Sequence, residues 1–140
     1  METGTKSDKI RVLLVDDNPD LLEITQLHLS AMGFLVFAAT NANDAMKVIT
    51  SAPIDVVLSD IRMPGCDGIQ LLKRIREESV RVPGLLFITG FADLLPNMQK
   101  EDLEKHGVFE ILTKPVDRNR LYCAVVAAAA ATRARLSAAA

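Results

Sequence analysis

The chain has 140 residues, which is the length of one globular domain rather than two. Hydrophobic residues make up 49% and charged residues 24%, so the chain can form an apolar core and wholesale disorder is excluded. The net charge is −2 and aromatic residues amount to 4%, which argues against a nucleic-acid-binding surface as the main function.

The first half of the chain contains three predicted strands separated by two predicted helices. Ile10–Val15 is a short run of branched apolar residues, typical of a buried parallel strand. Pro19 suits the first turn of the helix that follows. A second strand over Phe34–Ala38, a second helix over Asn43–Ser51 and a third strand over Ile54–Ser59 complete this half.

The first predicted helix has recognisable ends and an apolar face. Asn18 or Asp17 is its expected cap, and Gly33 is expected to end it. Residues at helical spacing are predicted to point inward, namely Leu21, Ile24, Thr25, His28 and Met32. For His28, a partly buried structural role is therefore favoured over that of a phosphohistidine.

The second half repeats the alternation. A helix over Asp67–Glu78 is followed by strands over Gly84–Thr89 and Val108–Thr113. Between these strands, Phe91–His106 is expected to contain a helix that a proline within it kinks or delays. Asp117 is predicted to cap the last helix.

Strands that alternate with helices predict a doubly wound α/β fold, in which a five-stranded parallel sheet carries helices on both faces. In such sheets, ligands bind at the carboxyl ends of the strands. Five residues with chemically useful side chains stand at these ends, namely Asp16, Asp17, Asp60, Thr89 and Lys114.

The predicted pocket at these strand ends is strongly charged. At about 5 Å and an effective dielectric of about 20, each pair among Asp16, Asp17 and Asp60 repels by roughly 3 kcal/mol. Such a site requires a cation, and oxygen ligands with open positions suit Mg²⁺. Lys114 would add a positive charge for a phosphoryl oxygen, and Thr89 a hydroxyl. The set describes phosphoryl transfer to a carboxylate nucleophile.

Each of these residues also has an ordinary structural explanation. Asp16 and Asp17 alone would be explained as helix-capping carboxylates, since acidic residues favour helix N-termini. Asp60 alone would be a loop carboxylate, and Lys114 alone a solvated lysine. Their joint placement at strand ends favours the site.

Four short motifs resemble the receiver domain of bacterial two-component response regulators: Asp16-Asp17, Ser59-Asp60-Ile61-Arg62-Met63-Pro64, Thr89-Gly90 and Lys114-Pro115. The likeness extends from about Ile10 to Ala130 and keeps the motifs in the family's order. Each dipeptide alone is unspecific, whereas four of them at strand ends are specific. The resemblance implies a flavodoxin-like sheet with the strand order 2-1-3-4-5.

The resemblance also implies residue roles. Asp60 would accept a phosphoryl group from a phosphohistidine on a sensor histidine kinase or a histidine phosphotransfer protein. Thr89 and Lys114 would bind phosphoryl oxygens, and the bond between Lys114 and Pro115 is often cis in this family. The implied Mg²⁺ ligands are Asp17 directly, Asp16 through water, Asp60, and the backbone carbonyl of Arg62. Self-phosphorylation and self-dephosphorylation at Asp60 are the only activities expected, so the chain is not an enzyme in the ordinary sense.

Some positions depart from the family pattern. Ile111 stands where the family usually has an aromatic switch residue, so any signal is expected to travel by packing or helix displacement. Thr89 and Lys114 lie farther apart than in the family, so the helix between them is expected to be shifted, shortened or mobile. Arg62 and Phe91 occupy positions that tune the lifetime of the acyl phosphate, and neither can orient an attacking water, which predicts slow self-dephosphorylation.

The two ends of the chain and its two cysteines carry further expectations. Residues 1–9 are expected to form a polar leader, residues 10–130 the receiver domain, and residues 131–140 an alanine-rich tail. The alanine-rich stretch Ala124–Ala140 is expected to form a helix extension that frays and has little to bury, and a contact helix for a partner is the alternative. Cys66 and Cys123 match no metal or redox spacing, so both are expected to be reduced, small buried side chains of a cytoplasmic protein.

The leading hypothesis is a single-domain receiver that signals to an unknown downstream protein, with no nucleic acid bound and no membrane insertion. A fragment of a larger hybrid kinase would have the same sequence features. A phosphorylation-independent interaction module on the same fold is the alternative, motivated by Ile111. A partner that binds equally well with and without phosphate would identify it. A Mg²⁺-dependent phosphohydrolase would need an Asp-x-Asp pair after the first strand, which Asp16-Asp17-Asn18 does not provide.

Overall fold

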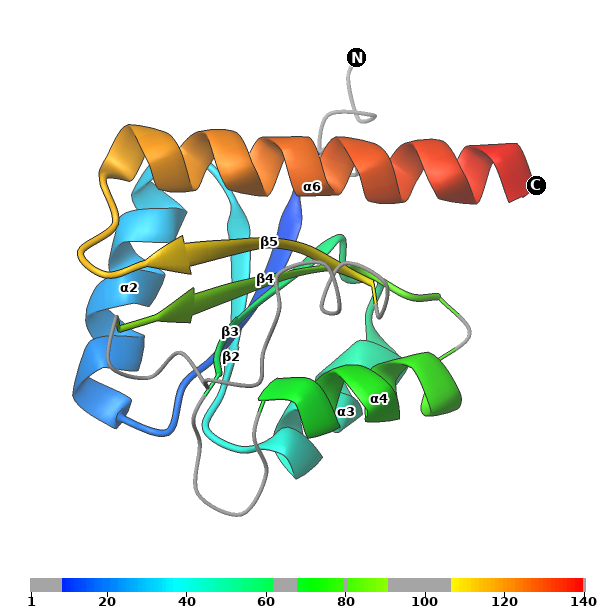
Figure 1. The fold of residues 1–140 in the computed structure, drawn as a ribbon, viewed down its shortest axis with the longest axis horizontal. Coiled ribbons are helices and arrows are strands. Elements are labelled where there is room, and N and C mark those ends of the chain that lie inside the picture. The colour runs from blue at the N-terminus through cyan, green and yellow to red at the C-terminus, as the bar shows by residue number, and fades with distance from the viewer. Residues whose placement is uncertain (1–8, 62–67, 80, 91–106, 140) are drawn as a thin grey trace.

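The computed structural model describes residues 9–61, 68–79, 81–90 and 107–139. Five parallel strands form one sheet in the order β2-β1-β3-β4-β5, which confirms the predicted fold class and strand order (Figure 1). The strands are β1 (Arg11–Val15), β2 (Leu35–Ala39), β3 (Val56–Asp60), β4 (Gly84–Thr89) and β5 (Val108–Thr113). Each lies within two residues of the predicted range at both ends.

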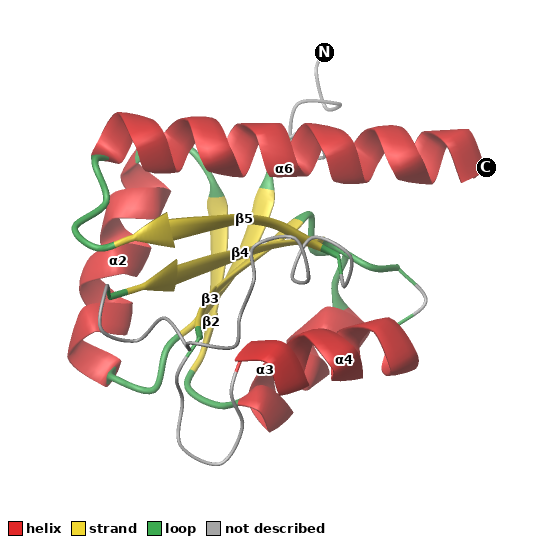
Figure 2. Ribbon diagram, in the orientation of Figure 1, coloured by secondary structure: helices red, strands yellow, loops and turns green. Residues whose placement is uncertain are grey.

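Helices cover both faces of this sheet (Figure 2). The described helices are α2 (Pro19–Ala31), α3 (Ala42–Ser51), α4 (Gly68–Glu78) and α6 (Arg118–Ala139). Helices α2 and α6 pack on one face, and α3 and α4 pack on the other. The region Phe91–His106 with its Pro96, and the residues Arg62 and Cys66, lie outside the described residues, so the expectations for them stay predictions.

The central strands have no polar face because both of their faces are covered. On β1, Leu13 and Val15 point into the core under α3 and α4, whereas Val12 and Leu14 point into the core under α2 and α6. All four side chains are buried. The continuous apolar run of this segment is therefore the pattern that a parallel strand between two helical layers requires.

Helix α2 begins as predicted but turns a different face inward. Asn18 is its N-cap and accepts hydrogen bonds from two amides of the first turn, and Pro19 is the first helical residue. Leu22 and Leu29 reach the core, and Met32 packs against it partly buried, as predicted, whereas Leu21, Ile24 and His28 are exposed. The predicted inward face was therefore wrong for Leu21, Ile24 and His28. Two apolar stripes run side by side on this helix, and only one of them can face the sheet.

Helix α6 approaches the sheet closely because its inward side chains are small. Ala124, Ala128 and Ala129 are buried. A side chain on Gly84, at the start of β4, would lie 3.2 Å from the carbonyl oxygen of Ala128. At the α2–β2 junction, the ring of Phe34 stacks on Tyr122 of α6, with 5.5 Å between the ring centroids. The alanine-rich stretch from Ala124 is thus helical as far as Ala139, as predicted, and it has more to bury than expected.

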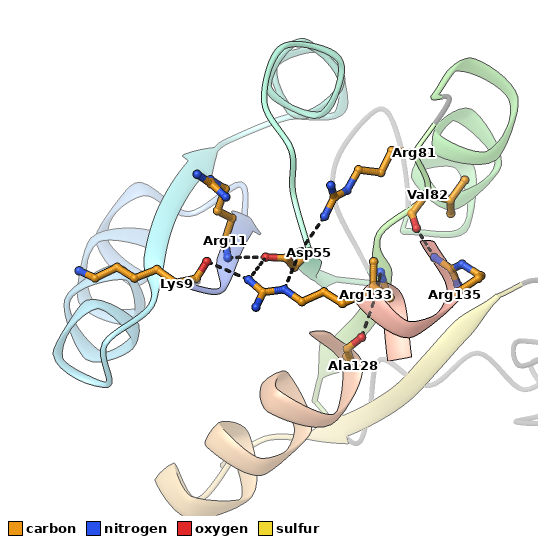
Figure 3. A network of polar contacts seen from close by, with 10 residues as sticks. Lys9, Arg11, Asp55, Arg81, Val82, Ala128, Arg133 and Arg135 are labelled. Atoms are coloured by element: carbon orange, nitrogen blue, oxygen red, sulfur yellow. Dashed lines mark hydrogen bonds and ion pairs between the residues drawn. The ribbon is translucent and has the colours of Figure 1, made fainter. Parts of the chain in front are cut away.

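A charged cluster joins the second half of α6 to the opposite end of β3 from Asp60 (Figure 3). Asp55 is buried, with 2% of its side chain exposed. It binds Arg81 at 2.8 Å and Arg133 at 3.0 Å, and it also accepts the backbone amide of Arg11 at 2.9 Å. The cluster therefore connects four distant parts of the chain.

Two polar contacts extend this attachment. The hydroxyl of Thr132 donates to the carbonyl of Ala128 at 3.0 Å and accepts the amide of Gly84 at 2.9 Å. Arg135 also binds the carbonyl of Val82. Helix α6 is consequently held against the sheet beyond the point where its apolar contacts end.

Two further predictions concern the burial of Cys123 and the absence of a membrane-spanning helix. Cys123 is a free thiol and it is exposed, so its predicted burial was wrong. No helix within the described ranges is long and apolar enough to cross a membrane.

Candidate functional site

Three of the predicted site residues meet at the carboxyl ends of the strands. Asp16 follows β1 directly, Asp60 is the last residue of β3, and Lys114 follows β5 directly. All three line one cavity of about 440 Å³. The topology explains this meeting, because parallel strands bring their carboxyl ends to the same edge of the sheet.

Asp60 and Lys114 form the centre of the site. The ammonium Nζ of Lys114 lies 3.3 Å from Oδ2 of Asp60. The Asp60 side chain is 15% exposed and that of Lys114 is 41% exposed, so the carboxylate is the more enclosed partner. Lys114 is also held through its backbone, because its amide donates to the carbonyl of Thr89 at 2.8 Å. The peptide bond between Lys114 and Pro115 is cis.

The main chain around Asp60 is fixed by a neighbouring side chain. The hydroxyl of Ser59, which is buried, donates to the carbonyl oxygen of Asp60 at 2.9 Å. In the sequence Ser59 was part of a motif and had no assigned role. A hydroxyl beside a predicted nucleophile was the available signal, but the acceptor atom could not be predicted from it.

Asp16 is half-buried at the wall of the same cavity. Its Oδ1 accepts the amide of Asn18 at 2.9 Å, so this residue also supports the start of α2. Burial raises the pKa of its carboxyl group, and the hydrogen bond from Asn18 opposes that shift. The negative charges of Asp60 and Asp17 raise the pKa further, against the positive charge of Lys114. The carboxyl group of Asp16 is therefore harder to ionise in the folded protein than in the unfolded chain.

Asp16→Asn is expected to stabilise the metal-free protein at about pH 7. Since the pKa of Asp16 is raised by folding, the folded protein binds this proton more tightly than the unfolded chain does. The resulting stabilisation is complete below the unfolded pKa and is lost as the pH rises through the folded pKa. The variant avoids that loss, so its advantage should shrink as the pH falls. Thermal denaturation in chelator at several pH values measures this.

Magnesium gives the second half of this test. Mg²⁺ should raise the melting temperature of the native protein more than that of Asp16→Asn, because the variant lacks one candidate ligand. Asp20→Asn is the matched control, because Asp20 is an exposed residue in the first turn of α2. It should respond to Mg²⁺ as the native protein does. A metal-free Asp16→Asn variant that is less stable than the native protein at about pH 7 would contradict the prediction.

The remaining predicted residues are placed differently. Asp17 is exposed and is absent from the lining of the cavity. Thr89 is fully buried at the end of β4, and its hydroxyl lies 3.3 Å from the carbonyl oxygen of Gly90. Ile111, at the usual aromatic position of the family, packs partly buried against the core under α3 and α4.

The donor atoms fit Mg²⁺ with water as additional ligand. Within the described ranges, no three acidic, histidine or cysteine side chains are gathered closely enough to hold a metal ion by themselves. Mg²⁺ does not require such a cage, since it keeps several waters and is usually bound by one or two carboxylates and by phosphate oxygens. Asp16 and Asp60 line the same cavity and supply such carboxylates.

The cavity also has an apolar wall that the sequence did not predict as part of the site. Leu21 and Ile24 of α2 line it although they are exposed, and Ile88 of β4 lines its floor. These are residues that the sequence placed in the core. The site is consequently open toward one apolar side of the molecule.

The chain is similar to known proteins over most of its length. A family model described as the response regulator receiver domain matches residues 12–126. This range includes every strand end that carries a site residue.

Relatives and solved structures agree with that match. The chain is 34% identical to the transcriptional regulatory protein GlrR of Escherichia coli over 114 residues. This aligned region is 81% of this chain and 25% of that protein. It is 38% identical to the sensor histidine kinase GacS of Pseudomonas protegens over 112 residues. This aligned region is 79% of this chain and 12% of that protein. A crystal structure of a response regulator receiver domain protein from Clostridium thermocellum matches with a TM-score of 0.76 at 26% identity, covering 89% of this chain and 97% of that one. The chain thus spans a quarter or less of these two curated relatives.

Proposed function

This chain belongs to the response regulator receiver domain family, and we propose that Asp60 is its phosphoacceptor. Receiver domains accept phosphoryl groups in two-component signalling and are not enzymes in the ordinary sense. The assignment to Asp60 rests on one observation above all. Its carboxylate ends a central strand, lines the cavity and lies 3.3 Å from the ammonium of Lys114.

The chemistry is a displacement at phosphorus. An oxygen of Asp60 attacks the phosphorus atom of a phosphohistidine, a P–O bond forms, and the P–N bond to the imidazole breaks. The imidazole of the donor leaves with the electron pair of that bond. Lys114 neutralises negative charge on the transferred group, and its backbone bond to Thr89 fixes the main chain from which this side chain extends. Positioning and charge neutralisation are thus the contributions of this chain.

We propose Mg²⁺ as the cofactor, held by Asp16, Asp17, Asp60 and the backbone carbonyl of Arg62. When bound, it would supply positive charge to the carboxylates and to the phosphoryl oxygens. The shared cavity of Asp16 and Asp60 supports this, because Mg²⁺ is usually bound by one or two carboxylates together with water. Thr89 is proposed to bind a phosphoryl oxygen by turning its hydroxyl away from Gly90.

The proposed phosphodonor is a sensor histidine kinase or a histidine phosphotransfer protein. GacS, one of the relatives, is itself named a sensor histidine kinase, and GlrR is named a transcriptional regulatory protein. The partner that this chain signals to is proposed to be a protein rather than a nucleic acid. A cytoplasmic location is proposed as well, which fits the free and exposed thiol of Cys123.

Mass spectrometry of the intact protein tests the proposed function. After incubation with Mg²⁺ and acetyl phosphate, one added phosphoryl group is expected, and a chelator should prevent its addition. Reduction of the acyl phosphate with borohydride, followed by proteolysis, should map the modified residue to Asp60. An adduct on another residue would contradict the assignment. Without an adduct from acetyl phosphate or from a phosphohistidine donor, a phosphorylation-independent interaction module would be the better description.

A further inference from the structure

Gly68, the first residue of α4, lies in a narrow space beside Asp60. A Cβ atom at this position would lie 2.5 Å from Cε1 of Phe87 and 3.1 Å from the carbonyl oxygen of Asp60. The first distance is shorter than real carbon contacts allow, and the second is tight. The ring of Phe87 and the main chain of Asp60 therefore leave no room for a Cβ atom at Gly68.

The backbone of Gly68 does not itself require a glycine. Positive φ angles occur in the described part of the chain at Gly33 and Gly107, and not at Gly68. Gly68 lies in a helix, where alanine is normally the better residue. The missing side chain is thus explained by the close approach of Phe87 and Asp60 rather than by backbone conformation.

A backbone hydrogen bond joins Gly68 to Ile61, the residue directly after Asp60. The amide of Gly68 donates to the carbonyl of Ile61 at 2.7 Å. Asp60 is therefore followed at once by a backbone hydrogen bond that depends on the position of Gly68. A displacement of Gly68 would be passed to the main chain that carries the carboxylate.

Phe87 is fixed independently of that segment. Its side chain is fully buried in the middle of β4, between Ser59 of β3 and Ile111 of β5 in the register of the sheet. Two residues further along the same strand, Thr89 accepts the backbone amide of Lys114. Strand β4 consequently fixes the main chain of Lys114 through Thr89, and through Phe87 it leaves no room for a side chain at Gly68.

We propose that Phe87, acting through Gly68, is a positioning residue for phosphoryl transfer. Its ring sets the position of the Asp60 main chain relative to Lys114, whose backbone is held by the same strand. The proposal rests on the proposed function of Asp60 as phosphoacceptor. According to this proposal, β4 controls the distance between the carboxylate of Asp60 and the ammonium of Lys114. The same strand also carries Thr89.

The test is a double-mutant cycle of Gly68→Ala and Phe87→Leu, with the phosphorylation rate measured at saturating acetyl phosphate and Mg²⁺. Gly68→Ala should lower this rate at least about tenfold, since misplacing a reacting group by about 1 Å can cost about a hundredfold. Phe87→Leu should lower the rate as well, since it removes the ring that sets the position of Gly68, and a native rate in this variant would overturn the proposal. The same change removes the ring that alanine would meet. The double variant should therefore recover to within about threefold of Phe87→Leu. A double variant as slow as Gly68→Ala would overturn the proposal.

Controls separate positioning from a loss of stability. Gly84→Ala introduces the same methyl group at the other end of β4, where it would lie 3.0 Å from Oγ1 of Thr132. It should destabilise the protein and leave the rate per folded molecule unchanged. A Gly84→Ala variant as slow as Gly68→Ala would also overturn the proposal. Phe87→Met replaces Phe87→Leu in the cycle if the leucine variant does not fold.

The native protein distinguishes this proposal from the proposed function. If the native protein acquires no phosphoryl group, the assignment of Asp60 fails and the proposal fails with it. If the native protein is phosphorylated and Gly68→Ala matches its rate, the positioning role alone fails. The donor concentration for half-maximal rate should change little in Gly68→Ala, because the contact affects placement of the acceptor rather than binding of the donor.

Discussion

Asp60→Asn is expected to lose phosphorylation to below detection while keeping the fold. The amide has the size of the carboxylate but is not a nucleophile for phosphorus at neutral pH. The ion pair that is lost involves a lysine whose side chain is 41% exposed, so its removal should change stability by about 1 kcal/mol or less. Removal of this charge also removes one cause of the raised pKa of Asp16. Intact-mass measurement after treatment with a phosphodonor checks the first expectation, and thermal denaturation checks the second.

The control for this variant is Asp20→Asn, which makes the same change at an exposed position in α2. It should acquire one phosphoryl group at the native rate. A full yield of adduct on Asp60→Asn would show that another side chain accepts the group. Asp16 would then be the next residue to examine, since it lines the same cavity.

Asp55→Asn is expected to lower the free energy of unfolding by about 2–3 kcal/mol. Asp55 accepts from two guanidinium groups and a backbone amide, and it is nearly fully buried. An asparagine offers one acceptor oxygen and turns an amide donor toward groups that also donate. The estimate lies below that for a fully buried pair because the side chains of Arg81 and Arg133 are 38% and 39% exposed. Urea denaturation measures it.

Two comparisons make this result specific. Glu78→Gln removes a surface pair, at 3.0 Å from Arg74, and should change stability by less than about 1 kcal/mol. Phosphorylation per folded molecule of Asp55→Asn should equal that of the native protein, because Asp55 precedes β3 and Asp60 ends it. A loss of stability no larger than that of Glu78→Gln would contradict the role given to the Asp55 cluster.

The strands were predictable because parallel strands under two helical layers leave a strong signal, whereas their order was implied by the family resemblance. Runs such as Ile10–Val15 are apolar on both faces, and polar residues follow where each strand ends. The meeting of Asp16, Asp60 and Lys114 followed from the parallel arrangement, which brings the carboxyl ends of the strands to one edge. The face of α2 did not, because Leu21 and Leu22 are both apolar and the choice between them depends on how the helix lies on the sheet.

The contacts that attach α6 to the sheet could not be predicted from the sequence. Asp55 and Arg133 are 78 positions apart, and nothing near either residue indicates the other. The many alanines predicted a helix with little apolar surface to bury. In the structure, these small side chains instead allow α6 to approach Gly84 closely. Gly68 carried a weak signal, since a glycine at the start of a helical pattern is unusual, but its neighbour Phe87 could not be deduced.

The stacking of Tyr122 on Phe34 has a spectroscopic consequence. The chain has one tyrosine and no tryptophan. Its intrinsic ultraviolet emission therefore comes from a single phenol ring, which sits where α6 meets the turn before β2. Any sliding of α6 across the sheet changes the surroundings of that ring, so the unlabelled protein carries its own optical reporter of this helix.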